Sequence, residues 1–305
     1  MARGQSIRIF LADGTVTGIR HAEVVNWTGQ AIACPRSRLG ELHSWDEAHR
    51  PGVYLLFGFD EESGAAAVYI GEAENVFVRL QDHLSKKDFW NEVVIFTNKD
   101  ENLTKAHARY LESKLVAATA RSRRYALTNS SQPQGSALPR GDRDAMESFL
   151  DQIRVLLGVL GHRVLEPITG TAEEAPQSSF QRVPIESGPT AGSTSGTEFH
   201  LSIKGIAARA VQTDEGLVVR AGSGAASKVS DSLSAGYRKI RDQLVQQGTL
   251  IQSGNQFSFA ADALFASPSA AAAVIVGYPI NGRDVWKTQA GVSLGHIEKV
   301  AAEQG

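Results

Sequence analysis

The chain has 305 residues with 42% hydrophobic content, 31 Lys and Arg, 33 Asp and Glu, and a formal net charge of -2. This length suits two to three ordinary domains, and the apolar content excludes a wholly disordered chain. A membrane-spanning helix is excluded because no run of about 18 apolar residues occurs. The balanced charge means that a nucleic-acid partner would have to meet a local basic patch. A single cysteine, Cys34, excludes an internal disulfide and a thiolate metal cage. Since no signal-like apolar core follows Met1, we expect a cytoplasmic protein with no membrane partner.

Residues 169–198 predict a flexible linker. They consist mainly of Gly, Pro, Ser, Thr, Ala and charged residues, which bury too little apolar surface to become ordered. The linker divides the chain into a front part and a back part, residues 199–305. Within the front part we expect a small N-terminal β unit over residues 1–48 and a second domain over residues 49–168.

The front part predicts strands first and then helices. Apolar runs over residues 7–11, 19–25 and 30–34 predict the strands of the N-terminal unit, and runs over 53–57, 66–70 and 93–96 predict three more. Apolar residues at helical spacing predict helices over residues 76–84, 103–118 and 142–160. Asn75 and Asn102 are the expected N-caps of the first two helices, and Gly161 ends the third.

The back part predicts a separate mixed α/β domain. Strands are expected over residues 199–203 and 216–220, a helix through Leu233 and Leu244, and a hairpin over residues 250–259. Ser267-Pro268 predicts the start of another helix, because Ser is a good N-cap and Pro suits the first helical position. Asn281-Gly282 predicts a tight turn. The fold class is therefore α+β, with several domains.

Residues 50–130 contain the pattern that indicates chemistry. Tyr54 and Tyr69 each lie near a glycine on a predicted strand, in Gly-Val-Tyr and Tyr-Ile-Gly. Arg79 and His83 are four residues apart, so they share one face of a helix. Such a set suits cleavage of a phosphodiester, because Arg can hold a phosphate by two parallel hydrogen bonds and a phenol or imidazole can take a proton from water.

Glu112 lies in the middle of a predicted helix, beside residues that we expect to be buried. A carboxylate there is costly unless it is paired or bound to metal. One carboxylate is enough to anchor a single Mg²⁺ that keeps most of its waters. The alternative is a surface ion pair of Glu112 with Arg109 or Lys105.

Simple structural explanations remain open for the other residues. Tyr54 and Tyr69 are also typical strand aromatics, and Arg79 with His83 would make an ordinary solvated pair. Asn129 fits a loop residue that bonds the backbone. Lys86 and Lys87 follow the Arg79 helix, where they would flank a phosphate-binding cleft or complement the helix dipole.

This ordered set resembles the GIY-YIG endonuclease domain, over about residues 50–132. The resemblance implies a three-stranded antiparallel sheet flanked by helices. It implies that Tyr69, assisted by Tyr54, positions or deprotonates the attacking water, and that Arg79 binds the scissile phosphate with His83 nearby. Glu112 would be the one protein ligand of Mg²⁺ or Mn²⁺, and Asn129 would brace the site. Glu72 departs from the family, in which many members carry Lys or a neutral polar residue there.

The back part resembles an uncharacterised C-terminal domain that is appended to such nucleases. The likeness is carried by residues 265–271, Asn281-Gly282 and Trp286-Lys287. The same pattern is similar to small domains associated with restriction and methylase systems. The resemblance implies a metal-dependent DNA endonuclease in defence, restriction or repair, with an accessory DNA-binding domain. Two alternatives stay open: an inactive nucleic-acid-binding module on a nuclease fold, and an interaction scaffold.

Overall fold

The computed structural model describes residues 4–60, 65–130, 133–166, 197–214 and 216–304. The front part is built on one seven-stranded sheet. In spatial order its strands are β1 (Ile7–Leu11), β2 (Arg20–Val24), β3 (Gly29–Pro35), β6 (Trp90–Asn98), β4 (Gly52–Phe59), β5 (Ala66–Ala73) and β7 (Ala126–Leu127). Neighbouring strands are antiparallel except for β5 and β7, which are parallel.

The N-terminal strands continue this sheet and do not form a unit of their own. β3 pairs with β6 along its whole length, from Gly29 opposite Asn98 to Pro35 opposite Glu92. The expected three-stranded sheet is present as β6-β4-β5, but it is the centre of a larger one. The sheet extends beyond three strands because β6 has apolar side chains buried on both of its faces. Without β3, one edge of β6 would have unpaired backbone groups.

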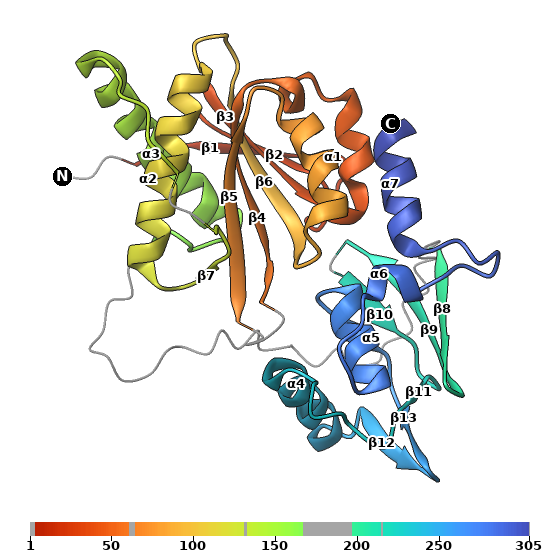
Figure 1. Ribbon diagram of the computed structural model, residues 1–305. Coiled ribbons are helices and arrows are strands. Elements are labelled where there is room, and N and C mark those ends of the chain that lie inside the picture. Colours follow the sequence, from red (N-terminus) through yellow and green to blue (C-terminus); the bar gives the residue numbers. More distant parts are fainter. Residues whose placement is uncertain (1–3, 61–64, 131–132, 167–196, 215, 305) are drawn as a thin grey trace.

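Helices cover both faces of the sheet (Figure 1). α2 (Lys105–Ser122) and α3 (Arg140–Val159) pack on one face. α1 (Val76–Lys86) and the 3₁₀ segments η1 (Arg36–Ser44) and η2 (Asp46–His49) pack on the other.

The two-residue period of β4 decides which side chains meet which helices. Val53 and Leu55 join the cluster under α2 and α3, whereas Tyr54 and Leu56 join the cluster under α1. Tyr69 of β5 packs on the α1 side as well. Both tyrosines singled out from the sequence therefore lie on the face that α1 covers.

The caps explain where the helices begin. Asn75 is the N-cap of α1, as expected, and its Oδ1 accepts a hydrogen bond from the Val78 N–H at 3.1 Å. The prediction that Asn102 caps the next helix is wrong. α2 begins after Thr104, which forms a capping box with His107. The Asn102 N–H instead bonds the Asp100 carboxylate at 3.0 Å.

The back part contains two sheets. The first has the order β14 (Ala263–Phe265), β10 (Gly216–Val219), β9 (Ile206–Thr213), β8 (Glu198–Ile203); the second has the order β11 (Gly224–Ala225), β13 (Gln256–Phe259), β12 (Leu250–Ser253). Its helices are α4 (Ala235–Gln246), α5 (Pro268–Val276), α6 (Gly282–Val285) and α7 (Leu294–Gln304). The turn expected at Asn281-Gly282 is instead the start of α6, because the Asn281 side chain accepts the Arg283 N–H at 2.9 Å.

α7 returns to the front part and lies beside α1 (Figure 1). Ala302 is buried and belongs to the core cluster that also contains residues of α1 and η1. The helix also approaches η1 closely, since a Cβ on Gly40 would lie 2.4 Å from the Ala301 carbonyl oxygen. The linker predicted over residues 169–198 lies almost wholly outside the described residues. Within the described ranges, each helix is too short or too polar to cross a membrane.

Candidate active site

Tyr54 is placed by a glycine on the neighbouring strand. Tyr54 and Gly71 are cross-strand partners, and a Cβ on Gly71 would lie only 2.4 Å from the phenolic oxygen. Glycine is required at position 52 for a similar reason: a Cβ there would lie 2.3 Å from the Phe96 carbonyl oxygen of β6. The two glycines beside the tyrosines thus allow close packing of the strands and of the phenol.

Tyr54 and His83 form a buried pair. The Tyr54 hydroxyl lies 2.8 Å from Nε2 of His83, and the two side chains are 0% and 2% exposed. A hydrogen bond to Tyr54 raises the pKa of Arg79. Because a guanidinium can only donate, the Tyr54 oxygen accepts from Arg79, and the tautomer of His83 sets which group donates in the Tyr54–His83 bond. The other ring nitrogen of His83 has no partner within the described ranges.

Burial sets the protonation of this pair. It raises the pKa of Tyr54 well above the ordinary value of a phenol. Burial, with the nearby charges of Arg79 and Lys87, lowers the pKa of His83 to about 4. At neutral pH both groups are uncharged. Since neither side chain reaches solvent, they position other groups and do not themselves touch a substrate.

Tyr69 is the more accessible phenol. It is half-buried, its ring centroid lies 5.3 Å from that of His83, and burial raises its pKa as well. Hydrogen bonds from Arg79 and with Tyr54 act in the opposite direction on the Tyr69 pKa. Tyr69 is therefore linked to the buried pair and also partly exposed to solvent.

Arg79 and His83 lie on one face of α1, and Lys87 follows directly after the helix ends. Arg79, His83 and Lys87 are successive four-residue steps, and the Lys87 ammonium lies 3.9 Å from the centre of the Tyr69 ring. Arg79 pairs with Asp82 at 3.6 Å and is 45% exposed. From the sequence, Lys87 was expected only to flank a cleft. The four-residue spacing from Arg79 to His83 continues to Lys87, and this was the sequence signal that Lys87 lies near the tyrosines.

Glu112 lies on α2 and acts on the two phenols through its charge. Its charge raises the pKa of both Tyr54 and Tyr69. The alternative ion pair is not formed, because Lys105 pairs with Glu74 at 3.0 Å and Arg109 with Glu72 at 3.5 Å. Burial, followed by the neighbouring Glu72, raises the pKa of Glu112 to about 7.

This environment fits a divalent cation. Glu112 lines an open cleft with Arg109 and residues 133–136, and one carboxylate oxygen of Glu72 is buried with no partner among the described residues. Mg²⁺ is commonly held by one or two carboxylates together with substrate phosphates. A cluster of three or more ligating side chains does not occur in the described part of the chain. Glu112, with Glu72 beside it, is the pair that would hold the ion.

Asn129 braces β5 between Tyr69 and Gly71. Its Oδ1 accepts from the Ile70 N–H at 3.0 Å, and its Nδ2 donates to the Ile70 carbonyl at 2.7 Å. The short strand β7 pairs only with Ala67 and Val68, so the Asn129 amide takes the place of a further strand residue. Asn129 thus fixes the backbone that carries Tyr69.

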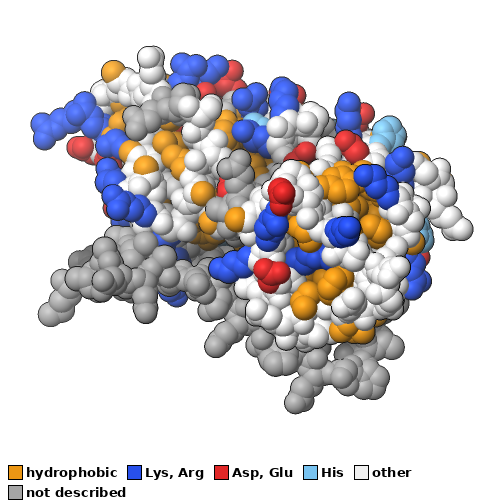
Figure 2. Space-filling view, turned by 60° about the horizontal axis from the view of Figure 1, so that its bottom comes forward, with side chains coloured by type: hydrophobic (Ala, Val, Ile, Leu, Met, Phe, Trp, Pro, Cys, Tyr) orange, Lys and Arg blue, Asp and Glu red, His pale blue; other side chains and the backbone are white. Residues whose placement is uncertain are grey.

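The surface charge is mixed. On the face shown in Figure 2, Lys and Arg side chains are interspersed with Asp and Glu and with apolar patches. This agrees with the net charge of -2. Any affinity for a polyanion would depend on local groups such as Arg79 and Lys87.

Comparison with known families matches residues 199–298 to a domain of unknown function (DUF4357). The expectation of an uncharacterised C-terminal domain is therefore confirmed. The front part is not matched to the GIY-YIG family, so that resemblance depends on the site residues alone. No curated protein and no solved structure matches the chain.

Proposed function

We propose that the protein is a metal-dependent DNA endonuclease that hydrolyses phosphodiester bonds. The observation that carries the proposal is Glu112, a half-buried carboxylate that forms no ion pair within the described ranges and whose charge raises the pKa of two phenols linked to Arg79. A carboxylate in that setting is costly without a cation. The resemblance to GIY-YIG endonucleases supports the same conclusion.

In this proposal Arg79 holds the scissile phosphate and Tyr69 orients the attacking water. The water oxygen bonds to phosphorus while the bond to the leaving oxygen breaks. Since burial keeps both phenols protonated, Tyr69 holds the water in position by a hydrogen bond; the proton that the water loses passes to solvent, and the leaving oxygen takes a proton from solvent. Mg²⁺ or Mn²⁺ at Glu112 would supply charge stabilisation for the phosphate.

Cleavage of supercoiled, linear and single-stranded DNA, modified and unmodified, tests the proposal with EDTA, Mg²⁺ and Mn²⁺. We expect metal-dependent cutting that falls by at least about 100-fold in Glu112→Ala and Arg79→Ala. The matched controls are Glu74→Ala, an exposed carboxylate that pairs with Lys105, and Arg121→Ala at the end of α2. Cutting by Glu112→Ala at the wild-type rate would refute a role for the carboxylate.

A second candidate is a nucleic-acid-binding module without cleavage. Glu72 beside Glu112 favours it, because two carboxylates repel a phosphate when no cation is present. This candidate predicts binding that weakens steeply with salt and persists in Glu112→Ala, with no product under any condition. In either case the C-terminal domain would hold or select the DNA, in defence, restriction or repair.

A further inference from the structure

Arg36 caps the end of the helix that carries Arg79 and His83. Its guanidinium donates to the Leu84 carbonyl at 2.7 Å and to the Lys87 carbonyl at 2.6 Å. The last carbonyls of a helix have no partner within the helix, so such a donor fixes its final turn. Arg36 is 3% exposed and lies against the Trp90 ring, so water does not compete with these bonds.

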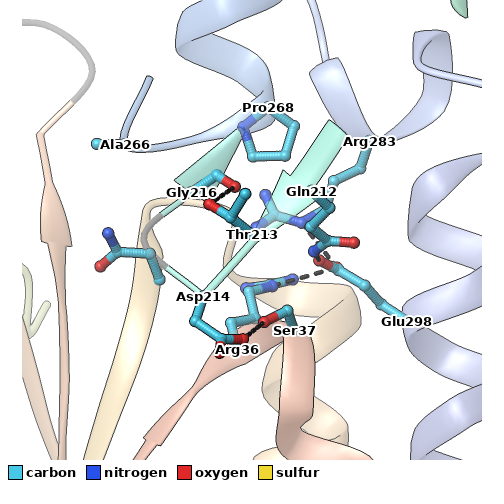
Figure 3. A pocket seen from close by; sticks show the side chains of 11 residues that line it. Arg36, Ser37, Gln212, Thr213, Asp214, Gly216, Ala266, Pro268, Arg283 and Glu298 are labelled. Carbon is cyan, nitrogen blue, oxygen red and sulfur yellow. Dashed lines mark hydrogen bonds and ion pairs between the residues drawn. The ribbon is translucent and has the colours of Figure 1, made fainter. Parts of the chain in front are cut away.

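The C-terminal domain holds Arg36 in turn (Figure 3). One carboxylate oxygen of Glu298 accepts from Arg36 Nε at 3.3 Å and from Arg283 Nε at 3.0 Å. Its other oxygen accepts from Gln212 at 3.1 Å. Arg283 also donates to Asp88, at 2.9 Å to its carbonyl and at 3.2 Å to its carboxylate.

The charges make this junction depend on Glu298. Arg36 and Arg283 are buried near each other, and burial together with Arg283 lowers the pKa of Arg36 to about 10. Both guanidiniums also pair with the Asp88 carboxylate, at 3.8 and 3.2 Å, but that side chain is 37% exposed, whereas the shared Glu298 carboxylate is buried. Removing one partner of such a buried set leaves uncompensated charge. The cavity beside it, of about 20 Å³, holds no more than about one water molecule, so this is a junction and not a ligand site.

The junction fixes the backbone at Lys87 and at the residue that follows it. The Lys87 carbonyl is held by Arg36, and the next carbonyl, that of Asp88, is held by Arg283. Its ammonium lies 3.9 Å from the Tyr69 ring centre. Lys87 forms no ion pair with a described carboxylate, whereas neighbouring Lys86 pairs with Asp82 at 3.4 Å. An unpaired cation beside the accessible phenol is suited to a phosphate.

We propose that Lys87 is a further phosphate-binding residue of the site, and that Glu298 of the C-terminal domain positions it through Arg36 and Arg283. The inference deepens the proposed function and rests on it. The ligand is a phosphodiester, whose oxygens would meet Arg79 and Lys87 beside Tyr69. The C-terminal domain thereby becomes part of the active-site scaffold.

The first test compares Lys87→Ala with Lys299→Ala, which removes an exposed lysine that pairs with Glu303. We expect Lys87→Ala to lower kcat/KM for DNA cleavage by about 100-fold and to reduce the salt slope of DNA binding by about one. Lys87→Arg should restore part of both, because the charge is kept. Lys299→Ala should retain wild-type values. Equal losses in the two alanine variants would overturn the assignment of Lys87.

The second test is a double-mutant cycle of Glu298→Gln with Lys87→Ala in the full chain. If Glu298 acts through Lys87, Glu298→Gln lowers kcat in the wild type and has little further effect when Lys87 is absent. Losses that multiply would overturn the positioning role. Glu303→Gln is the control, since Glu303 forms an exposed pair with Lys299. Arg36→Lys, which keeps the charge but loses the paired carbonyl bonds, replaces Glu298→Gln if that variant does not fold.

The two proposals fail in different ways. If wild type binds DNA and cuts none of the forms tested, the endonuclease proposal fails. The change in salt slope then decides the Lys87 assignment, and the same cycle read by binding affinity decides the positioning role. If wild type neither binds nor cuts DNA, both proposals are wrong.

Discussion

Tyr54 and Gly71 face each other across β4 and β5, and the phenolic oxygen of Tyr54 occupies the space where a Cβ of residue 71 would lie. The phenol can therefore reach His83 at 2.8 Å only because its strand partner has no side chain. In this site, glycine is required by a close contact and not by an unusual backbone angle.

Gly71→Ala tests that contact. The added methyl would meet the Tyr54 oxygen at 2.4 Å, so we expect a loss of about 1–3 kcal/mol in the free energy of unfolding and a loss of cleavage. Urea unfolding measures the first. Gly158→Ala in α3 is the control: nothing lies within 4 Å of that position, and alanine should stabilise the helix by about 0.5–1 kcal/mol. Equal stability of the two variants would contradict the contact.

His83 predicts a loss of stability in acid. Its pKa falls from an ordinary 6.5 to about 4 in the folded state, so the unfolded chain binds the proton more readily. Its contribution is complete above pH 6.5 and is lost as the pH falls toward 4, by about 2 kcal/mol between pH 7 and pH 5. His83→Gln should remove this dependence, as measured by urea unfolding at both pH values. A variant with the slope of the wild type would show that His83 does not titrate in this way.

For Glu112 we expect the opposite dependence of stability on pH. Its folded pKa of about 7 lies above the ordinary 4.5, so the folded state binds the proton more tightly and stability falls as the pH rises through this window. In EDTA, Glu112→Gln should be more stable than wild type by about 1–3 kcal/mol at pH 8, and the difference should vanish near pH 4.5. Thermal melts across this range measure it. A less stable Glu112→Gln at pH 8 would mean that the carboxylate has a stabilising partner.

Alanine substitutions at Asn129 and Asn102 compare an asparagine that holds the backbone with one that does not cap its helix. Asn129→Ala removes two hydrogen bonds to Ile70 and should cost about 1–3 kcal/mol in the free energy of unfolding, with slower cleavage because β5 is less well held. Asn102→Ala should change the free energy of unfolding by less than about 0.5 kcal/mol, since its exposed side chain does not cap α2. A large loss of stability in Asn102→Ala would show that Asn102, and not Thr104, caps α2.

Features set by residues close in the chain could be predicted from the sequence, whereas contacts between residues far apart in the chain could not. The Asn75 and Ser267 caps were predicted because the acceptor and its N–H are close in the chain. The Asn102 error arose because Thr104 with His107 forms a better local arrangement two residues later. β9 was not predicted, since its outward-facing alanine and arginine weaken the apolar alternation. Glu298 could not be found at all, because its partner Arg36 is 262 residues away.

α7 also affects how the chain reaches its final form. Residues 294–304 complete a core whose other members include η1 and α1, near the opposite end of the sequence. During synthesis the front domain can build its sheet early, but the surface of α1 and η1 that α7 covers stays exposed until α7 has emerged from the ribosome. The arginine cap of α1 gains its carboxylate partner only then. A nascent chain would thus carry an unfinished site for most of its translation.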